Sequence, residues 1–268
     1  MSGFSAAWLE LREPYDRRAR NETVLSAVAY AFAKQSAVSI VDLACGLGST
    51  LRTFAPLLKS RQTWKLVDND LSLLSRTPRS TPPDLMVTTI PIDLDRDLEA
   101  ALDGPVDLVT TSALLDLVSD QWLQRLAVEA AARRLPIYAA LSYDGRVEFS
   151  PSDTADDGIV AAVNTHQRTD KGFGLALGPD AAHAAVKAFE RVGYDVVQGR
   201  SDWIFGSQDR EIQLEVLSGW AHAAREIGDV PLNDIIEWLT RRRDHVAAGR
   251  SSIRVGHVDL FTKPTGSR

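Results

Sequence analysis

Two acidic residues and a glycine-rich turn are the clearest chemical signal in this sequence. Residues 40–50 read IVDLACGLGST, so a β-branched run reaches Asp42 and is followed by small residues that include Gly46 and Gly48. A strand, a tight turn and a helix in this order bring the backbone close to a ligand, because larger side chains would fill the space that the ligand needs. Asp68 ends the next apolar run, where a carboxylate can accept both hydroxyls of a ribose. We interpret the two features as a site for an adenosine-type nucleoside.

The spacing of the glycines separates two kinds of nucleoside ligand. A dinucleotide fingerprint has a third glycine, and Leu51 occupies that position here. The carboxylate of Asp42 would repel a pyrophosphate but favour an ammonium or a sulfonium group. The alternative is a tight turn whose glycines only permit close packing.

The pattern D-x-A-x-G-x-G resembles motif I of the class I (seven-β-strand) S-adenosylmethionine-dependent methyltransferases, with Ala44 where a first glycine is more usual. The resemblance covers about residues 38–143. It implies S-adenosyl-L-methionine as the cofactor and an α/β fold with a doubly wound, mostly parallel seven-stranded sheet. In this Rossmann-like fold the last strand lies antiparallel between the fifth and the sixth.

The resemblance also assigns contacts for the cofactor beyond the glycine turn. Asp93 would accept the adenine amine and Leu94 would supply a backbone and apolar contact, although Asp93 could instead cap the next helix. Ser112 would line the cofactor at the end of the fourth strand. Asp70 could replace Asp68 as the ribose acid if the second strand runs two residues longer. The predicted cofactor-binding residues are Asp42, Ala44, Gly46, Gly48, Asp68, Asn69, Asp93, Leu94, Ser112 and Arg20.

The N-terminal segment resembles the lid of many small-molecule methyltransferases. The cofactor's carboxylate needs a cation or backbone amides, and Arg12, Tyr15 and Arg20 are the candidates in this segment. We place Arg20 at the cofactor and Tyr15 at the substrate. A surface helix with internal ion pairs is the alternative.

A polar segment at 164–174 predicts a substrate-facing loop, because glycines beside an aromatic residue let a segment close over a ligand. Within it, His166 is the candidate general base, since a neutral imidazole can accept a proton from a nucleophile. The predicted substrate-binding residues are Tyr15, Asp116, Lys171, Phe173 and Trp203. The alternatives are an exposed connection for the loop, a local backbone contact for Asp116 and core packing for Trp203. No spacing of histidines and carboxylates predicts a metal site.

Alternating strands and helices are predicted along the chain. Strands are predicted at 38–43, 63–68, 86–92, 106–111, 136–143, 194–197 and 253–262. Helices are predicted at 49–59, 98–102, 120–134, 158–167, 179–192, 210–227 and 232–247, and two more within 5–35 that divide near Pro14. A short helix after the strand at 63–68 is predicted to end before a loop with Pro78, Pro82 and Pro83. We therefore predict a helical lid at 1–36 and a methyltransferase domain at 37–268, with cap insertions at about 144–178 and 208–250.

Composition sets the remaining expectations. A net charge of −6 over 268 residues argues against nucleic acid as a partner, because phosphate binding needs a basic surface. The single cysteine, Cys45, excludes an internal disulfide and fits the cytoplasm. No secretory signal and no membrane-spanning run is predicted.

These patterns predict an enzyme that transfers a methyl group from S-adenosylmethionine to a small-molecule acceptor. Three alternatives are a non-catalytic protein that binds S-adenosylmethionine, an NAD-dependent oxidoreductase, and a methyltransferase acting on protein or RNA. The sequence does not identify the acceptor, the atom that is methylated or the oligomeric state.

Overall fold

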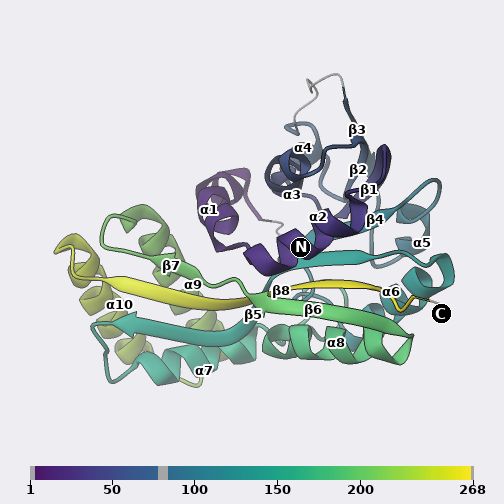
Figure 1. Ribbon diagram of the computed structural model, residues 1–268. Helices are drawn as coiled ribbons and strands as arrows, with labels where there is room; N and C mark the ends of the chain where they lie inside the picture. The colour runs from purple at the N-terminus through teal and green to yellow at the C-terminus, as the bar shows by residue number, and fades with distance from the viewer. Residues whose placement is uncertain (1–3, 78–83, 267–268) are drawn as a thin grey trace.

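The computed structural model, which describes residues 4–77 and 84–266, is built around one mixed β-sheet (Figure 1). The strands follow the order β3-β2-β1-β4-β5-β8-β6, and β7 pairs with β8. They are β1 (Ala37–Leu43), β2 (Arg61–Asp68), β3 (Leu85–Pro91), β4 (Leu108–Ser112), β5 (Ile137–Ser150), β6 (Tyr194–Arg200), β7 (Trp203–Phe205) and β8 (Ser252–Pro264). Strands β1 to β5 are parallel, and β8 lies antiparallel between β5 and β6 as predicted. The predicted loop with Pro78, Pro82 and Pro83 lies outside the described residues.

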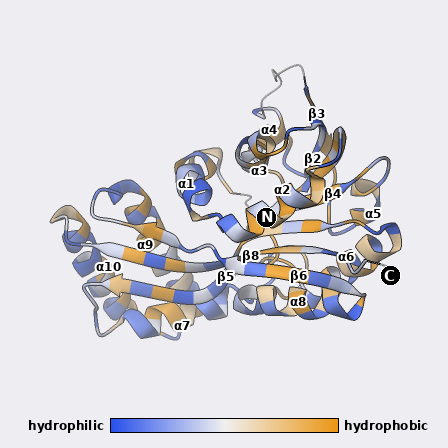
Figure 2. Ribbon diagram, viewed as in Figure 1, coloured by the Kyte–Doolittle hydropathy of each residue, from blue (hydrophilic) through white to orange (hydrophobic). Residues whose placement is uncertain are grey.

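Helices cover both faces of this sheet. They are α1 (Ala6–Ala19), α2 (Glu22–Phe32), α3 (Ser49–Phe54), α4 (Leu71–Leu74), α5 (Leu98–Ala101), α6 (Asp120–Arg133), α7 (Asp156–His166), α8 (Ala181–Arg191), α9 (Arg210–Ile227) and α10 (Leu232–Ala247), with short 3₁₀ turns at Ala55–Leu57 and Gly178–Asp180. One core joins the sheet to α2, α3 and α4, and a second joins it to α5, α6 and α8. Figure 2 shows hydrophobic residues along the central strands and many hydrophilic residues on the outer helices α7 and α8. The result is a three-layer α/β fold.

The first two helices divide at a different place from the one predicted. Helix α1 continues through Pro14, and the chain breaks at Arg20, where the Asn21 side chain accepts the Val24 amide and caps α2. A proline inside a helix removes one hydrogen bond. Here α1 starts at a Ser5 cap and packs against β7, and this packing outweighs the missing bond.

Strand β5 extends past its predicted end at Tyr143 and continues to Ser150. A bulge between Tyr143 and Val147 changes its register against β8. Gly145 has a φ of +83°, and a Cβ atom on the facing Gly256 would lie 2.2 Å from the Asp144 carboxylate. Glycine at these two positions therefore permits the bulge, and β5 and β8 extend together beyond the main sheet (Figure 1).

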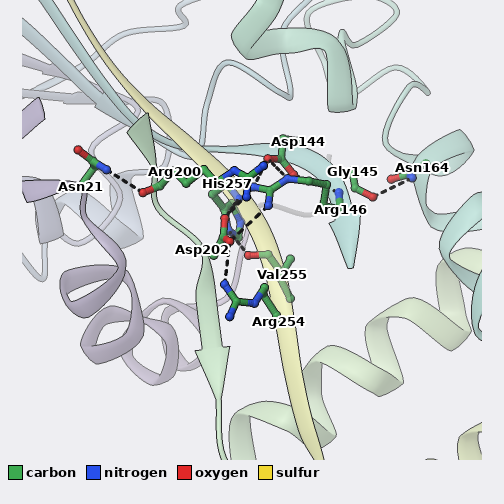
Figure 3. Close-up of polar contacts among 10 residues, drawn as sticks. All are labelled: Asn21, Asp144, Gly145, Arg146, Asn164, Arg200, Asp202, Arg254, Val255 and His257. Carbon is green, nitrogen blue, oxygen red and sulfur yellow. Dashed lines mark hydrogen bonds and ion pairs between the residues drawn. The ribbon is translucent and has the colours of Figure 1, made fainter. Parts of the chain in front are cut away.

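An ion-pair network joins the three strands at this bulge (Figure 3). Arg146 on β5 donates to Asp144 at 2.7 Å and to Asp202, which precedes β7, at 2.8 Å. Arg254 on β8 lies 3.3 Å from the same Asp202 carboxylate. The network holds β7 and the outer halves of β5 and β8 in one arrangement.

The extended strands carry a third hydrophobic core with α7, α9 and α10, which we call the cap. Arg242 of α10 is fully buried there and forms an ion pair with Asp156 at the start of α7. The same carboxylate accepts the indole N–H of Trp238 at 2.8 Å, and the Arg242 guanidinium donates to the Pro151 carbonyl at 2.6 Å. Because a buried charge needs such partners, these residues fix α7 against α10.

Candidate functional site

A cavity of about 630 Å³ lies at the carboxyl ends of β1, β2 and β4. This is the edge of an open α/β sheet where ligands bind, and the volume is in the range of small-molecule sites. Its wall also includes α1 and a loop of the segment after α7. The predicted site residues that line it are Ala44, Gly46, Asp68, Asn69, Asp93, Leu94, Ser112, Lys171 and Phe173.

Two alanines at the strand ends have unusual backbone conformations on this wall. Ala44 follows β1 with a φ of 52°, and Ala113 follows β4 with a φ of 51°. Residues other than glycine adopt this left-handed region at an energetic cost, and such strain gathers at functional sites. Ala44 thus has a backbone conformation that favours glycine, the more usual residue at this position of the motif.

Asp68 connects the two predicted parts of the nucleoside site. One carboxylate oxygen accepts the Gly46 amide at 2.8 Å, and the other accepts the Asp70 amide at 3.0 Å. Each oxygen has a further lone pair for a ligand, so Asp68 can hold the turn and still face the cavity. The Asp70 carboxylate instead caps α4 by accepting the amides of Ser72 and Leu73.

Asp93 and Leu94 line the cavity after β3. The Asp93 carboxylate accepts the Asp95 amide at 3.1 Å within the loop and does not cap α5, whose N-cap is Asp97, and its side chain is 45% exposed. The Leu94 carbonyl accepts the Trp122 indole at 2.7 Å. This bond fixes the strand end against α6.

Asp42 and Arg20 lie beneath the cavity wall and not on it. Asp42 is buried and accepts the Thr110 hydroxyl at 2.7 Å, and its other oxygen has no hydrogen-bond partner among the described residues. The Arg20 guanidinium donates to Ser112 at 3.1 Å and to Thr50 at 3.5 Å, both of which line the cavity. A positive charge is therefore present directly behind the wall. Gly48 caps α3 next to the cavity without lining it.

Burial raises the pKa of Asp42 from 3.8 to about 7, with the Thr110 hydroxyl and the Arg20 charge opposing the increase. The folded protein holds this proton more tightly than the unfolded chain, so the contribution to stability is complete below pH 3.8 and is lost as the pH rises toward 7. We expect Asp42→Asn to gain stability relative to the wild type as the pH rises, by about 2 kcal/mol between pH 5 and 7. Urea unfolding of both proteins across this range measures the difference. A difference that is independent of pH would contradict the shifted pKa.

Helix α1 covers the glycine turn through specific contacts. Glu13 and Arg52 of α3 form a two-point ion pair at 2.5 and 2.6 Å, and Arg52 also donates to the Leu47 carbonyl at 2.6 Å. A Cβ atom on Gly46 would lie 3.2 Å from the Leu9 side chain. The Arg52 contacts hold the pKa of Glu13 below its usual range, although burial acts in the other direction. This pair was missed at the sequence level because its members are far apart in the chain.

We expect Glu13→Gln to loosen α1 by about 1 kcal/mol, which is about a fivefold rise in amide hydrogen exchange within residues 6–19. The matched control is Glu10→Gln on the same helix. Glu10 pairs with Arg76 in an exposed position, so its loss should change exchange very little. Equal exchange in both variants would show that the Arg52 pair does not hold the helix.

A second α1 pair faces the cavity from the side of the cap. The buried Arg12 guanidinium donates to Asp16 at 2.9 Å, and both residues line the cavity. The Trp203 indole donates to the same Asp16 carboxylate at 2.9 Å, and its ring lies 5.0 Å from the Arg12 guanidinium. Arg12 and Asp16 are four residues apart on one helix, and this spacing is a signal in the sequence that could have predicted their ion pair.

Besides Asp42, Arg20 and Gly48, four further predicted residues do not line the cavity. Trp203 supports α1 from behind, and the Tyr15 hydroxyl donates to Asp209 of the cap at 3.1 Å. Asp116 is buried, which raises its pKa to about 6, and one of its oxygens has no partner in the described part of the chain. His166 does not line the cavity but lies behind Lys171, between that residue and Glu226. Its position therefore does not support the expected role as a base in contact with the substrate.

Comparisons with known proteins identify the fold. No protein-family model and no curated protein matches the sequence. Among solved structures, the cyclopropane synthase MmaA2 from Mycobacterium tuberculosis is 11% identical to this chain, with a TM-score of 0.51. The match covers 96% of this chain and 94% of the MmaA2 chain. The fold is that of the class I methyltransferases.

Two further structures agree with this assignment of the fold. A cyclopropane-fatty-acyl-phospholipid synthase-like protein from Lactobacillus casei is 15% identical, with a TM-score of 0.51, and covers 94% of this chain and 99% of its own. The YcgJ protein from Bacillus subtilis is 10% identical, with a TM-score of 0.50. The match covers 92% of this chain and 100% of the YcgJ chain. Over residues 4–77 and 84–266, we find no helix long and apolar enough to cross a bilayer. The same residues contain no group of three metal-ligating side chains.

Proposed function

We propose that this protein transfers a methyl group from S-adenosyl-L-methionine to a small-molecule acceptor. The observation that carries the proposal is Asp68, whose carboxylate faces the cavity while it holds the Gly46 amide at 2.8 Å. One residue thus joins the two features that a bound adenosyl group needs, a carboxylate for the ribose and a backbone turn held close to the ligand.

The residues of the cavity fit this cofactor. Asp68 would accept the ribose hydroxyls, Asn69 would lie beneath the adenine, and Asp93 with the amide of Leu94 would meet its polar edge. The backbone of Ala44 and Gly46 would lie along the homocysteine part. Arg20 behind Ser112 would balance the carboxylate at that end.

When bound, the cofactor supplies a methyl group already activated by a positive sulfur. The protein needs mainly to align a nucleophile with it and to exclude water. Glu13 and Asp16 are paired with Arg52 and Arg12, so the remaining carboxylates of the wall are Asp68, Asp70 and Asp93, which follow β2 and β3. At this end of the cavity they favour a positive group over an anionic one. An acidic wall also argues against a pyrophosphate, in agreement with the missing third glycine.

A small acceptor is supported by the way in which the cavity is covered. Helix α1 and the loop with Lys171 both contribute to its wall, whereas a protein or RNA acceptor would need an open, basic groove. Cys45 is buried as a free thiol in the glycine turn, and we infer the reducing cytoplasm as the place of action.

Calorimetric titration with S-adenosylhomocysteine and, separately, with NAD tests the proposal. We expect binding of S-adenosylhomocysteine and none of NAD, and the opposite result would overturn the assignment. The second step is transfer of a labelled methyl group to a panel of metabolites. Binding without transfer to any acceptor would favour the non-catalytic alternative.

A further inference from the structure

A short turn brings a lysine to the wall of the cavity. Residues 170–175, which we call the Lys171 turn, are closed by a β-bridge between the first and last residues. The Asp170 carboxylate accepts a hydrogen bond from the Gly172 amide at 2.6 Å. Gly172 has a φ of 102°, a conformation that favours glycine. The ring of Phe173 packs edge-on against Trp122 with centroids 5.5 Å apart. These contacts fix the turn at its base and at its tip.

The ammonium group of Lys171 is oriented by a hydroxyl group and an imidazole ring. It donates to the Thr169 hydroxyl at 3.0 Å and lies 3.4 Å from Nδ1 of His166. An ammonium can only donate, so Nδ1 accepts and the ring proton is on Nε2. Nε2 then donates to the Glu226 carboxylate at 2.9 Å. His166 and Glu226 thus position the lysine instead of facing the cavity.

Lys171 lacks the ionic partner that the other cation of the wall has. Arg12 pairs with Asp16 at 2.9 Å, whereas no carboxylate in the described part of the chain forms an ion pair with Lys171. Burial lowers the pKa of Lys171, with the more distant Glu226 charge opposing the change. A partly desolvated cation without a counter-ion favours an anionic ligand.

The rest of the wall limits what that anion can be. Apolar side chains line much of the cavity, namely Phe4, Leu9, Leu114, Leu117 and Phe173. Its carboxylates would repel a ligand with two negative charges more strongly than a ligand with one. A single carboxylate on an apolar body satisfies both conditions.

We infer that the methyl acceptor is an apolar small molecule with one carboxylate, and that Lys171 binds this carboxylate. The inference rests on the proposed function, since it assigns a substrate class to the same site. Lys171 belongs to the loop after α7, apart from the glycine turn, and Arg20 behind Thr50 and Ser112 already provides a charge for the cofactor.

The test compares an acid with its neutral amide on protein saturated with S-adenosylhomocysteine. The probes are 3-phenylpropionate and 3-phenylpropionamide, with affinities measured by calorimetry. We expect the acid to bind about tenfold more tightly, because a charge-assisted hydrogen bond is stronger than a neutral one. Equal affinities, or binding of neither probe, would overturn the inference while leaving the proposed function standing. Failure of S-adenosylhomocysteine itself to bind would contradict the proposed function, and the inference with it.

Variants identify the residue responsible. Lys171→Met should abolish the preference for the acid and leave the affinity for S-adenosylhomocysteine within about twofold of the wild type, and Lys171→Arg should keep part of the preference. The control is Arg168→Met, because Arg168 pairs with Asp180 outside the cavity and should not affect the preference. His166→Phe should reduce the preference without removing it. If Lys171→Met instead weakens the binding of S-adenosylhomocysteine and leaves the affinity for the acid unchanged, then Lys171 binds the cofactor's carboxylate and the inference is wrong.

Discussion

Replacing Asp68 with alanine should weaken the binding of S-adenosylhomocysteine by at least about a hundredfold. The variant loses the carboxylate proposed for the ribose hydroxyls. It also releases the Gly46 amide, now held at 2.8 Å, so the turn that should meet the homocysteine part loses its anchor. Calorimetric titration of the wild type and the variant measures the loss. Undiminished affinity in a folded variant would contradict the proposed orientation of the cofactor.

Asp70→Ala is the matched control for this prediction. Asp70 also lines the cavity, but its carboxylate caps α4 by accepting the Ser72 amide at 2.8 Å. The substitution should lower the free energy of unfolding by removing this cap, and it should change the affinity by no more than about twofold. A large loss in Asp70→Ala with a small loss in Asp68→Ala would instead assign the ribose to Asp70.

The contacts of α1 explain why the cavity and the cap form one unit. On one side Glu13 pairs with Arg52 beside the glycine turn. On the other side Asp16 accepts the Trp203 indole from β7, which pairs with β8 in the cap. Helix α1 therefore contacts both the glycine turn and the cap.

Local patterns were sufficient to predict the strands and the place where the glycine turn and Asp68 meet. The run up to Asp42, the turn at Gly46 and the acid at Asp68 lie on consecutive elements, so short-range sequence order determines where they meet. The bounds of α9 and α10 were also predicted, because apolar residues recur at helical spacing in them. The order of the strands follows from the family resemblance and not from the residues alone.

Contacts between distant segments could not be predicted. The Glu13–Arg52 pair joins residues that are 39 positions apart, and nothing in either local sequence indicates the other. The extension of β5 depends on a bulge whose glycine, Gly145, faces Gly256 across the sheet. His166 was predicted as a base because it is a histidine within the polar segment 164–174, whereas its position behind Lys171 depends on how the cap packs.

Replacing Asp156 with alanine should lower the free energy of unfolding by about 3–5 kcal/mol. The substitution leaves the fully buried Arg242 guanidinium without its carboxylate, and it also removes the acceptor of the Trp238 indole, now at 2.8 Å. Native stabilities are about 5–15 kcal/mol, so the loss is a large part of the total. Urea unfolding followed by tryptophan fluorescence measures it, since Trp238 lies at the site.

The control for Asp156→Ala is Asp157→Ala, one residue further along the first turn of α7. Asp157 is exposed, so its loss should cost only a few tenths of a kcal/mol through the helix dipole. The double variant Asp156→Asn with Arg242→Met should recover most of the stability, because neither charge then remains buried alone. A double variant as unstable as Asp156→Ala would show that the loss comes from packing in the cap and not from the unpaired guanidinium.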